Sequence, residues 1–559
     1  MSRVTVLLAI LFLATGCTRA SGPAQPMATA HVSAPGAPVA VVARPLAGAA
    51  GPCTGAFVAH DLDHVTSVPG EQVRMFEGNG TGVAISDLDA DGNLDIVLAN
   101  HHGPNTILWN QGGLRFQTER LGSGDARAVS IVDVDSDGRL DIVFTRRASG
   151  LNYWRNTGQA EPGARFVPDV LPGIVKPAYA MNWGDLDGDG DLDLVAASYD
   201  ASLLTDLGSA FLMESGAGVY YYEQRGARFV PTRLAGTSQA LALALFDVNS
   251  DGQRDIVVGN DFAVRDQTWV RQGDRWVEAQ PFATTSHSTM SLDAGDIDND
   301  GTFELFSTDM KPYDNSVATL AIWRPFMAAL WDPVPPGDPQ IMENVLQVRD
   351  EGGTFHNEAY ERGIDATGWS WSGKFGDLNN DGFVDLYVVN GMIEADTFRY
   401  LPNHELVEQN QALRNDGTGH FIPAPEWALG SPRSGRGMSM ADLDNDGDLD
   451  IVVNNLRAPA QLFENRLCSG AGLEVDLRWP ASTNTYALGA TLALHTSAGS
   501  QYREVRAASG YLSGDPARVH FGFPAGSMLR QLEIRWPDGA VPAIARPAPH
   551  PLLTVTRER

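Results

Sequence analysis

The strongest constraint on the fold is a nine-residue, aspartate-rich pattern that occurs seven times between residues 87 and 450. Each copy has an Asp or Asn oxygen at positions 1, 3 and 5, glycine at position 6 and a carboxylate at position 9. The copies span residues 87–95, 133–141, 185–193, 247–255, 296–304, 377–385 and 442–450. Repetition of this kind is typical of folds in which similar small units stack to share a core.

The pattern matches the ligand requirements of calcium, a hard ion that takes about six to eight oxygens. Positions 1, 3 and 5 can face one ion, glycine at position 6 permits a sharp turn, and position 9 closes the shell. The residue type at position 7 varies, as expected where only the backbone carbonyl is used. We therefore predict about seven bound Ca²⁺ ions per chain.

The predicted metal ligands are Asp87, Asp89, Asp91, Asn93, Asp95, Asp133, Asp135, Asp137, Arg139, Asp141, Asp185, Asp187, Asp189, Asp191, Asp193, Asp247, Asn249, Asp251, Gln253, Asp255, Asp296, Asp298, Asp300, Thr302, Glu304, Asp377, Asn379, Asp381, Phe383, Asp385, Asp442, Asp444, Asp446, Asp448 and Asp450.

Sites for a different metal, or loops without any metal, fit the pattern less well. An EF-hand needs an acidic residue at position 12, and none of the seven copies has one there. Magnesium uses fewer protein ligands, and transition metals favour His or Cys, which are absent from all seven loops. Plain Asp-Gly hairpin turns remain an alternative for a single copy, but seven matching sets of oxygens disfavour it.

The apolar residues around the loops predict an all-β fold. Positions 2 and 10 are aliphatic in every copy, so each loop joins two buried strands, and further strand-like runs lie between the loops. Units of about four strands that cannot bury both faces alone predict a seven-bladed β-propeller over residues 53–469. Phe57 and Val58 can supply the strand that closes the ring. Residues 470–559 predict a small β-sandwich or barrel.

The first residues are typical of an exported protein. Residues 1–16 read as a lipoprotein-type signal peptide, because a short apolar run after Arg3 ends in Ala-Thr-Gly before Cys17. We expect Cys17 to be cleaved and lipidated, with ordinary signal cleavage as the alternative. Residues 17–52, rich in Ala, Pro and Gly, predict a disordered tether. The expected location is the bacterial envelope, lipid-anchored at a membrane or cell surface, or otherwise secreted.

Two further cysteines, Cys53 and Cys468, lie just before the first repeat and just after the last. A disulfide between them would lock the closure of the ring, and an oxidising compartment would allow it. Two unrelated thiols remain the alternative.

With these loops the sequence resembles the integrin-α-like FG-GAP/VCBS propeller family, and more narrowly the CRTAC1-like proteins that end in an ASPIC/UnbV domain. The resemblance also rests on the stretch GWSWSGKFGDLNNDG that begins at Gly368 and on a C-terminal segment that includes IRWPDG from Ile534. It implies calcium binding at loop positions 1, 3, 5, 7 and 9 and an ASPIC/UnbV-like domain over residues 470–559. The family's role is adhesion or scaffolding by analogy, so the resemblance says more about fold than about function.

Three loops depart from the family pattern. Asn249 and Asn379 replace Asp at position 3, and Glu304 replaces Asp at position 9. The Asn loops lose one charge each, and the longer Glu304 side chain changes how the shell closes.

The sequence favours a binding or adhesion scaffold over an enzyme. No GxSxG, HExxH or Walker motif occurs, and the alternative is a propeller-based extracytoplasmic hydrolase or carbohydrate-active protein. Ser286, His287 and Ser288 read as a polar loop, and Trp369 and Trp371 read as blade-core residues. Residues 309–368 form the longest stretch between loops, as either a recognition element or a capping segment.

The expected partners follow from charge and location. A formal net charge of −29 argues against nucleic acid. We expect a protein or glycan partner at the cell surface, contact with the membrane only through a lipid anchor, and a monomer.

Overall fold

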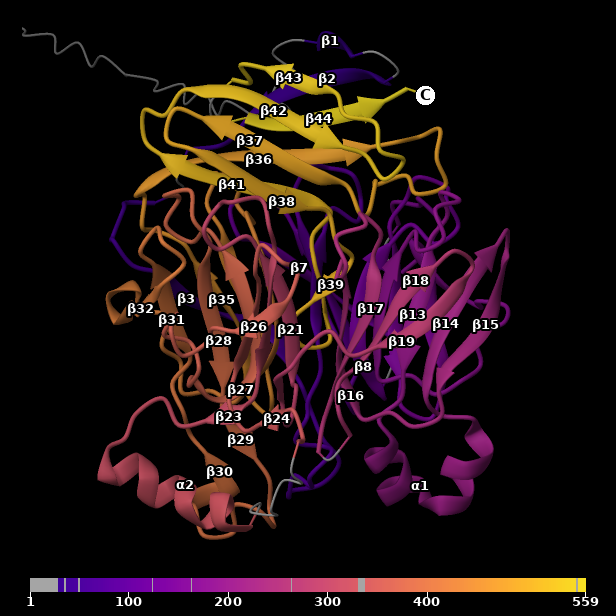
Figure 1. Ribbon diagram of the computed structural model, residues 1–559, viewed down its shortest axis with the longest axis vertical. Helices are drawn as coiled ribbons and strands as arrows, with labels where there is room; N and C mark the ends of the chain where they lie inside the picture. Colours follow the sequence, from indigo (N-terminus) through magenta and orange to yellow (C-terminus); the bar gives the residue numbers. More distant parts are fainter. Residues whose placement is uncertain are drawn as a thin grey trace, which may run out of the picture.

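The computed structural model describes residues 29–34, 37–48, 51–122, 124–161, 163–262, 264–329, 337–548 and 551–558. The predicted signal peptide and Cys17 lie outside the described residues. The described chain is almost entirely β-structure with two α-helices, α1 (Asp200–Ser215) and α2 (Val317–Ala329) (Figure 1). It forms a propeller with a smaller β-domain on one end and both helices at the other.

Seven sheets form the blades, which confirms the predicted seven-bladed propeller. Blades 1 to 3 consist of β4 (Val83–Ser86), β5 (Asp95–Leu98), β6 (Asn105–Asn110) and β7 (Phe116–Leu121); β8 (Ala126–Val132), β9 (Asp141–Arg146), β10 (Ser149–Asn156) and β11 (Phe166–Asp169); and β12 (Ala180–Gly184), β13 (Asp193–Ala197), β14 (Val219–Arg225) and β15 (Arg228–Ala235).

Blades 4 to 6 follow the same plan. They consist of β16 (Ala240–Phe246), β17 (Asp255–Asn260), β18 (Gln267–Gln272) and β19 (Arg275–Ala279); β21 (Ser291–Gly295), β22 (Glu304–Thr308), β25 (Val345–Arg349) and β26 (Phe355–Asn357); and β27 (Gly368–Gly376), β28 (Asp385–Asn390), β31 (Gln411–Asn415) and β32 (Phe421–Pro423), with β23 (Met310–Lys311) at the edge of blade 6.

In every blade the aspartate-rich loop connects the first strand to the second. The first strands line the axis and contact one another in a closed ring, in the order β4, β8, β12, β16, β21, β27, β33 and back to β4. All seven loops therefore lie at the same end of the propeller. One repeated loop thus sets where every axial strand ends.

Blade 7 closes the ring with a strand from the other end of the propeller sequence. It consists of β33 (Gly435–Ala441), β34 (Asp450–Asn455), β35 (Pro459–Glu464) and β3 (Val58–Val65). Strand β3 pairs antiparallel with β35, with Val58 opposite Glu464. This is the strand that the sequence predicted from Phe57 and Val58.

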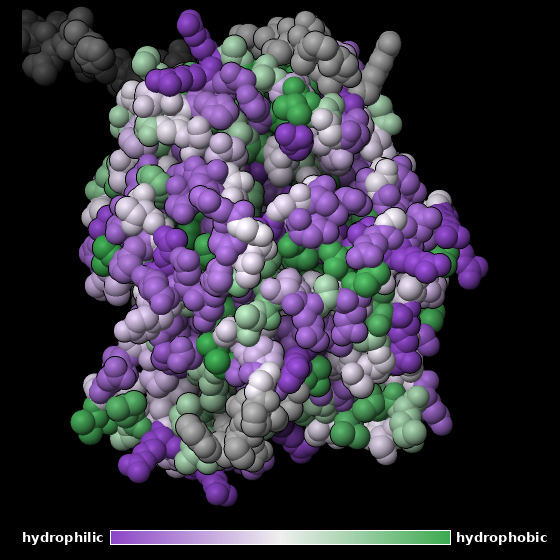
Figure 2. All heavy atoms as spheres, viewed as in Figure 1, coloured by the Kyte–Doolittle hydropathy of each residue, from purple (hydrophilic) through white to green (hydrophobic). Residues whose placement is uncertain are grey.

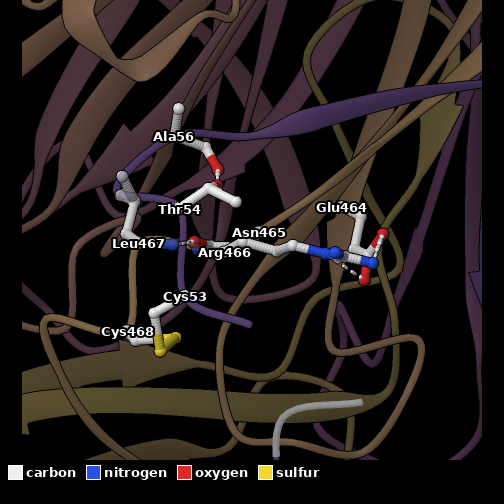
Figure 3. The surroundings of a disulfide bond; sticks show 8 residues. All are labelled: Cys53, Thr54, Ala56, Glu464, Asn465, Arg466, Leu467 and Cys468. Atoms are coloured by element: carbon white, nitrogen blue, oxygen red, sulfur yellow. Dashed lines mark hydrogen bonds and ion pairs between the residues drawn. A yellow bond between two sulfur atoms is a disulfide. The ribbon is translucent and has the colours of Figure 1, made fainter. Parts of the chain in front are cut away.

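A disulfide joins Cys53 to Cys468, the pair favoured from the sequence, with the two Cα atoms 5.7 Å apart (Figure 3). The backbone N–H of Thr54 also donates to the Arg466 carbonyl at 3.0 Å. In the same strand end, the N–H of Asn465 donates to the Asp450 carboxylate at 2.8 Å. Hydrogen bonds of the segment around Cys468 therefore connect the disulfide to the seventh aspartate loop.

The C-terminal domain is a β-sandwich, one of the two forms that the sequence allowed. One sheet contains β1 (Thr29–Ala34), β2 (Ala37–Pro45), β44 (Pro551–Arg557), β36 (Gly470–Arg478) and β41 (Arg518–Pro524), and the other contains β38 (Ser500–Glu504), β37 (Thr491–Thr496), β42 (Leu529–Arg535) and β43 (Ala543–Ala545). Both sheets contribute to its core, because Leu473 of the first and Leu492 and Leu532 of the second are buried in one shared cluster.

The predicted tether over residues 17–52 is wrong for residues 29–34 and 37–45, because β1 and β2 are strands of this domain. Strand β2 pairs antiparallel with β44, from Val39 opposite Arg557 to Pro45 opposite Pro551. Val39 and Val41 are buried, at 1% and 6% exposure, while Pro38 and Arg44 are exposed. The period of two was present in the sequence but hidden by the Ala- and Pro-rich composition around it.

A short hairpin of the C-terminal domain enters the propeller channel. Its strands, β39 (Ala508–Ser509) and β40 (Ser513–Gly514), contact the first strands of six blades between them. At its tip, the fully buried Tyr511 donates its hydroxyl to the Asn79 carbonyl at 2.8 Å and packs 5.1 Å from the Trp371 ring. The hairpin thus fills the axis of the propeller.

The long stretch over residues 309–368 is partly ordinary blade. Strands β25 and β26 complete blade 5, so the true insertion lies ahead of them and contains β23, α2 and β24 (Gln340–Ile341). Strand β24 pairs with β20 (Thr285–Ser286), and a second small ribbon pairs β29 (Met392–Ile393) with β30 (Glu405–Leu406). Helix α2 lies over the end of the propeller opposite the aspartate loops.

Candidate metal sites and the domain interface

The backbone of each aspartate loop uses two left-handed residues. Glycine at position 6 has φ between 84° and 102° in all seven loops, as the sequence predicted. Position 4 is also left-handed in every loop, with φ between 54° and 81°. The sequence reasoning missed this second position, although its residue types were a signal, since three are Asn and one is Gly. The position 4 residues are Ala90, Ser136, Gly188, Ser250, Asn299, Asn380 and Asn445.

The carboxylate at position 1 holds the turn. In all seven loops one of its oxygens accepts the N–H of the glycine at position 6, at 2.8–3.1 Å. The carboxylate at position 5 accepts the N–H of position 7, at 2.6–3.2 Å. These bonds turn the side-chain oxygens of positions 1 and 5 toward the inside of the loop.

The carboxylate at position 9 ties the loop to the blade. One oxygen accepts the N–H of position 2 in every loop, at 3.0–3.2 Å. In the six loops with Asp here, the other oxygen accepts an N–H at the end of the third strand, at 2.7–3.0 Å. The described residues provide no such third-strand bond for Glu304. The carboxylate at position 9 therefore mainly connects the strands of the blade. It has fewer free lone pairs for a metal ion than the predicted role in closing the coordination shell requires.

Five loops bring three carboxylates close enough to share one cation. One oxygen from each of the three lies within 4.8 Å of the others. The groups are Asp87, Asp89 and Asp95; Asp133, Asp135 and Asp141; Asp185, Asp187 and Asp189; Asp296, Asp298 and Asp300; and Asp442, Asp444 and Asp450. The two loops without such a group are those with Asn249 and Asn379 at position 3, where an amide oxygen stands in place of a carboxylate.

The clustered carboxylates of the loops repel one another, and a bound positive charge would relieve this repulsion. Burial raises the pKa of Asp95 and of Glu304 to about 8, and that of Asp141 to about 7, with the neighbouring carboxylates adding to the shift. A divalent cation among these oxygens would favour the charged carboxylates instead. The donor set is all oxygen, with no His or Cys, and it fits Ca²⁺. These Asp clusters can hold metal ions.

The C-terminal domain docks directly on the loops. The carbonyl of the glycine at position 6 accepts a bond from this domain in four of them: Gly92 from Arg518 at 3.3 Å, Gly138 from Tyr486 at 3.2 Å, Gly190 from Thr483 at 2.6 Å and Gly447 from His520 at 3.2 Å. The Asp133 carboxylate itself accepts the Thr485 hydroxyl.

Two further loops meet the domain by different contacts. Arg254 in loop 4 forms an ion pair with Glu504 at 2.7 Å. The backbone carbonyl of Asn379 in loop 6 accepts the hydroxyl of Ser469, the residue that leads into the domain, at 2.5 Å. The shape of the aspartate loops thus sets the surface on which the second domain sits.

The residues singled out outside the loops meet at the opposite end of the propeller. Ser288 is buried and lies 3.3 Å from the His287 ring, while the Asp309 carboxylate accepts the backbone N–H groups of both. Ser286 instead bonds the Ser307 hydroxyl at 2.9 Å. Trp369 and Trp371 are buried on β27, as expected of blade-core residues, but both also line a cavity that His287 and Ser288 share. No pattern in the sequence indicated that these segments meet.

Among the residues that the structure describes, neither helix combines the length and the apolar character needed to cross a bilayer.

Comparison with known families agrees with the repeat pattern and with the second domain. An FG-GAP-like repeat model matches residues 87–144, 133–196, 247–307 and 403–453. An ASPIC and UnbV model matches residues 480–559, within the C-terminal sandwich.

Individual proteins are more distant. Cartilage acidic protein 1 of Mus musculus is 24% identical over 495 residues, which cover 82% of this chain and 70% of the relative. The solved structure of BBS1N in complex with ARL6DN matches 73% of this chain and 97% of its own at 10% identity, with a TM-score of 0.38. The V. cholerae biofilm matrix protein Bap1 matches 88% of this chain and 63% of its own at 11% identity, with a TM-score of 0.30.

The repeats, the propeller built on them and the terminal sandwich together place this chain among the CRTAC1-like proteins, in which an FG-GAP-repeat β-propeller is joined to an ASPIC/UnbV domain.

Proposed function

We propose that this chain is an exported, lipid-anchored binding scaffold in which calcium is structural. In this proposal about seven Ca²⁺ ions fill the aspartate loops, and Cys17 carries the anchor in a bacterial envelope. The supporting observation is the docking of the C-terminal domain on the loop glycine carbonyls, because it makes loop shape a condition for joining the two domains.

The chemistry of the loops supports a structural ion. Each loop is built from backbone bonds to its own carboxylates, and the four glycine carbonyls that face the second domain are already occupied by its donors. When bound, the ion would supply the positive charge that the clustered carboxylates lack. Extracellular calcium modules bind at about 10⁻⁴ to 10⁻³ M, so such sites suit a calcium-rich exterior.

The arrangement around His287 favours binding over hydrolysis. A nucleophilic site needs a base that is oriented by a third group. Here the Asp309 carboxylate accepts backbone N–H groups from His287, Ser288 and Met310, at 2.7, 3.0 and 2.7 Å, and it makes no described bond to the imidazole. The carboxylate therefore shapes the loop and does not orient a base.

Metal analysis and limited proteolysis test the structural role. Protein purified in calcium should carry about seven ions, and chelator should release the C-terminal domain from the propeller, which proteolysis between residues 465 and 470 would detect. A chain that carries one or two ions, or that keeps both domains docked after all metal is removed, would refute this role. Acyl labelling of the wild type and of Cys17→Ser tests the anchor separately.

A further inference from the structure

A cavity of about 330 Å³ lies at the end of the propeller channel opposite the aspartate loops. We call it the far-face cavity. Its walls come from five blades, through Asn79, Tyr199, Asp261, Ser288 and Trp369. These residues lie before or at the start of the first strands, or after the second strands, whereas the aspartate loops lie between those strands.

The cavity is largely apolar and is lined by side chains that adapt to a guest. Methionine is flexible and polarisable, and aromatic rings offer flat surfaces for another ring. The apolar side chains of the walls include Met290, Met310, Met392, Phe262, Phe326 and Trp371. A volume in this range is typical of pockets for small organic molecules.

Helix α2 forms a fixed roof over the aromatic wall. Phe326 of the helix packs 4.7 Å from the Trp369 ring. Trp323, one turn earlier, donates its indole N–H to Glu408 at 3.1 Å, and the Tyr400 hydroxyl donates to the Ile322 carbonyl at 3.0 Å. The roof is therefore held at two points by the segment between β28 and β31 of blade 6.

The outer surface near this end is also apolar. Figure 2 shows apolar side chains gathered over both helices. They include Leu204 and Met213 of α1 and Val317 and Leu320 of α2, and Val317 is 85% exposed.

Two buried hydrogen-bond donors on the cavity wall have no acceptor among the described residues. They are the side-chain amide nitrogen of Asn79, a residue 4% exposed, and the indole N–H of Trp369, a residue 6% exposed. A buried donor without an acceptor costs about 1–3 kcal/mol. Both nitrogen atoms can only donate, so a guest that reaches them must present oxygen acceptors.

Two acidic residues line the cavity: Asp396 is exposed, and Asp261, which is buried, is already engaged. The Asp261 carboxylate accepts the Tyr199 hydroxyl at 2.5 Å and the Phe262 N–H at 2.8 Å. Burial raises the pKa of Asp261, which disfavours its charged form. A cationic guest therefore finds no free carboxylate on Asp261, and a sugar, with many donors of its own, fits the apolar walls poorly.

We propose that the far-face cavity binds a small, neutral, ring-bearing organic molecule through apolar contacts and through oxygen acceptors directed at Asn79 and Trp369. This inference goes beyond the structural role of calcium and does not depend on lipidation or on location.

The test uses the full chain in calcium and two fluorescent probes. Prodan is a neutral naphthyl ketone whose emission shifts to the red when its carbonyl accepts a hydrogen bond, and dimethylaminonaphthalene is the same ring system without the ketone. Prodan should bind to one saturable site and emit to the red of prodan in an aprotic, apolar solvent. Asn79→Leu and Trp369→Phe should each weaken prodan about five- to tenfold and move its emission to the blue. Neither variant should change the affinity of dimethylaminonaphthalene by more than about twofold.

Two control variants show whether binding depends on this cavity. Trp276→Phe removes another buried indole N–H without an acceptor among the described residues, on β19 away from the cavity, and should leave prodan binding unchanged. Met290→Trp, which fills the cavity, should abolish binding in a chain that keeps its calcium-dependent melting. Absence of saturable binding by the wild type, an equal loss in Trp276→Phe, or displacement of the dye by free monosaccharides would overturn the proposal. Since calcium-dependent melting is measured on the same samples, failure of the metal proposal would be seen separately.

Discussion

Substitution of the carboxylate at position 9 can distinguish its role as a clamp between strands from a role as a metal ligand. Asp255 is fully buried, and its two oxygens accept the N–H groups of Val248 and Arg271, each at 3.0 Å. In Asp255→Asn one oxygen becomes an amide that faces an N–H. One bond to a charged acceptor is then lost and one buried donor is left unpaired. The two effects together should lower the free energy of unfolding by about 3 kcal/mol.

The matched control lies in the same loop. Asp251, at position 5, is exposed, and Asp251→Asn keeps its size and shape. In chelator this variant should stay within about 0.5 kcal/mol of the wild type, because exposed substitutions have small effects. In calcium it should lose stability, because a ligand of the ion has been weakened.

The assay is denaturant unfolding followed by tryptophan fluorescence, in excess calcium and in excess chelator. A pH near 8 keeps Asp255 ionised, since burial raises its pKa to about 6. Asp255→Asn should be destabilised in both conditions and Asp251→Asn only in calcium. If Asp255→Asn matches the wild type in chelator, the carboxylate acts only through metal, and the clamp reasoning is refuted.

Three further outcomes are expected. Cys53→Ser should lower the unfolding free energy by roughly 5 kcal/mol, because the bridge spans 415 residues; a melting temperature equal to that of the wild type under non-reducing conditions would contradict this. In chelator the melting temperature should fall as pH rises from about 5 to 8. The pKa values of Asp95, Asp141 and Glu304 are raised in the folded state, so protonation of these groups stabilises the folded protein. This stabilisation is complete below about pH 4 and is lost as pH passes about 7 to 8. Calcium should abolish this fall, and a melting curve that is independent of pH in chelator would argue against repulsion in the loops. Deleting residues 29–45 should expose the edge of β44 and lower the first unfolding transition, whereas a deletion confined to residues 18–28 should not; equal melting of the two truncations would show that β2 adds no stability.

The features that could be predicted from the sequence are those set by short, repeated motifs. Seven loops with fixed positions for oxygen and glycine specify the blades and their number. The closing strand was visible because Phe57 and Val58 stand just ahead of the first repeat, and the bridge was visible because Cys53 and Cys468 flank the whole array. These features depend on spacing alone.

What the sequence did not reveal depends on contacts between distant segments. Val39 and Val41 alternate correctly for a strand, but their partner strand lies more than five hundred residues later, so composition alone suggested a tether. Tyr511 sits in a polar hairpin that looks like an ordinary loop until the ring supplies a channel to hold it. The far-face cavity likewise exists only because ring closure brings residues such as Asn79 and Trp369, far apart in the sequence, to one cavity.

The pairing of β2 with β44 imposes an order on synthesis and burial. Residues 37–45 leave the ribosome before every blade and residues 551–557 after all of them, and yet they are neighbours in one sheet. The hairpin that fills the channel is also made late, after all seven blades. A chain that ends before residue 508 would therefore leave the edge of β2 unpaired and the propeller channel unfilled. Both regions would be more susceptible to proteolysis. Only a chain that reaches β44 can bury β2.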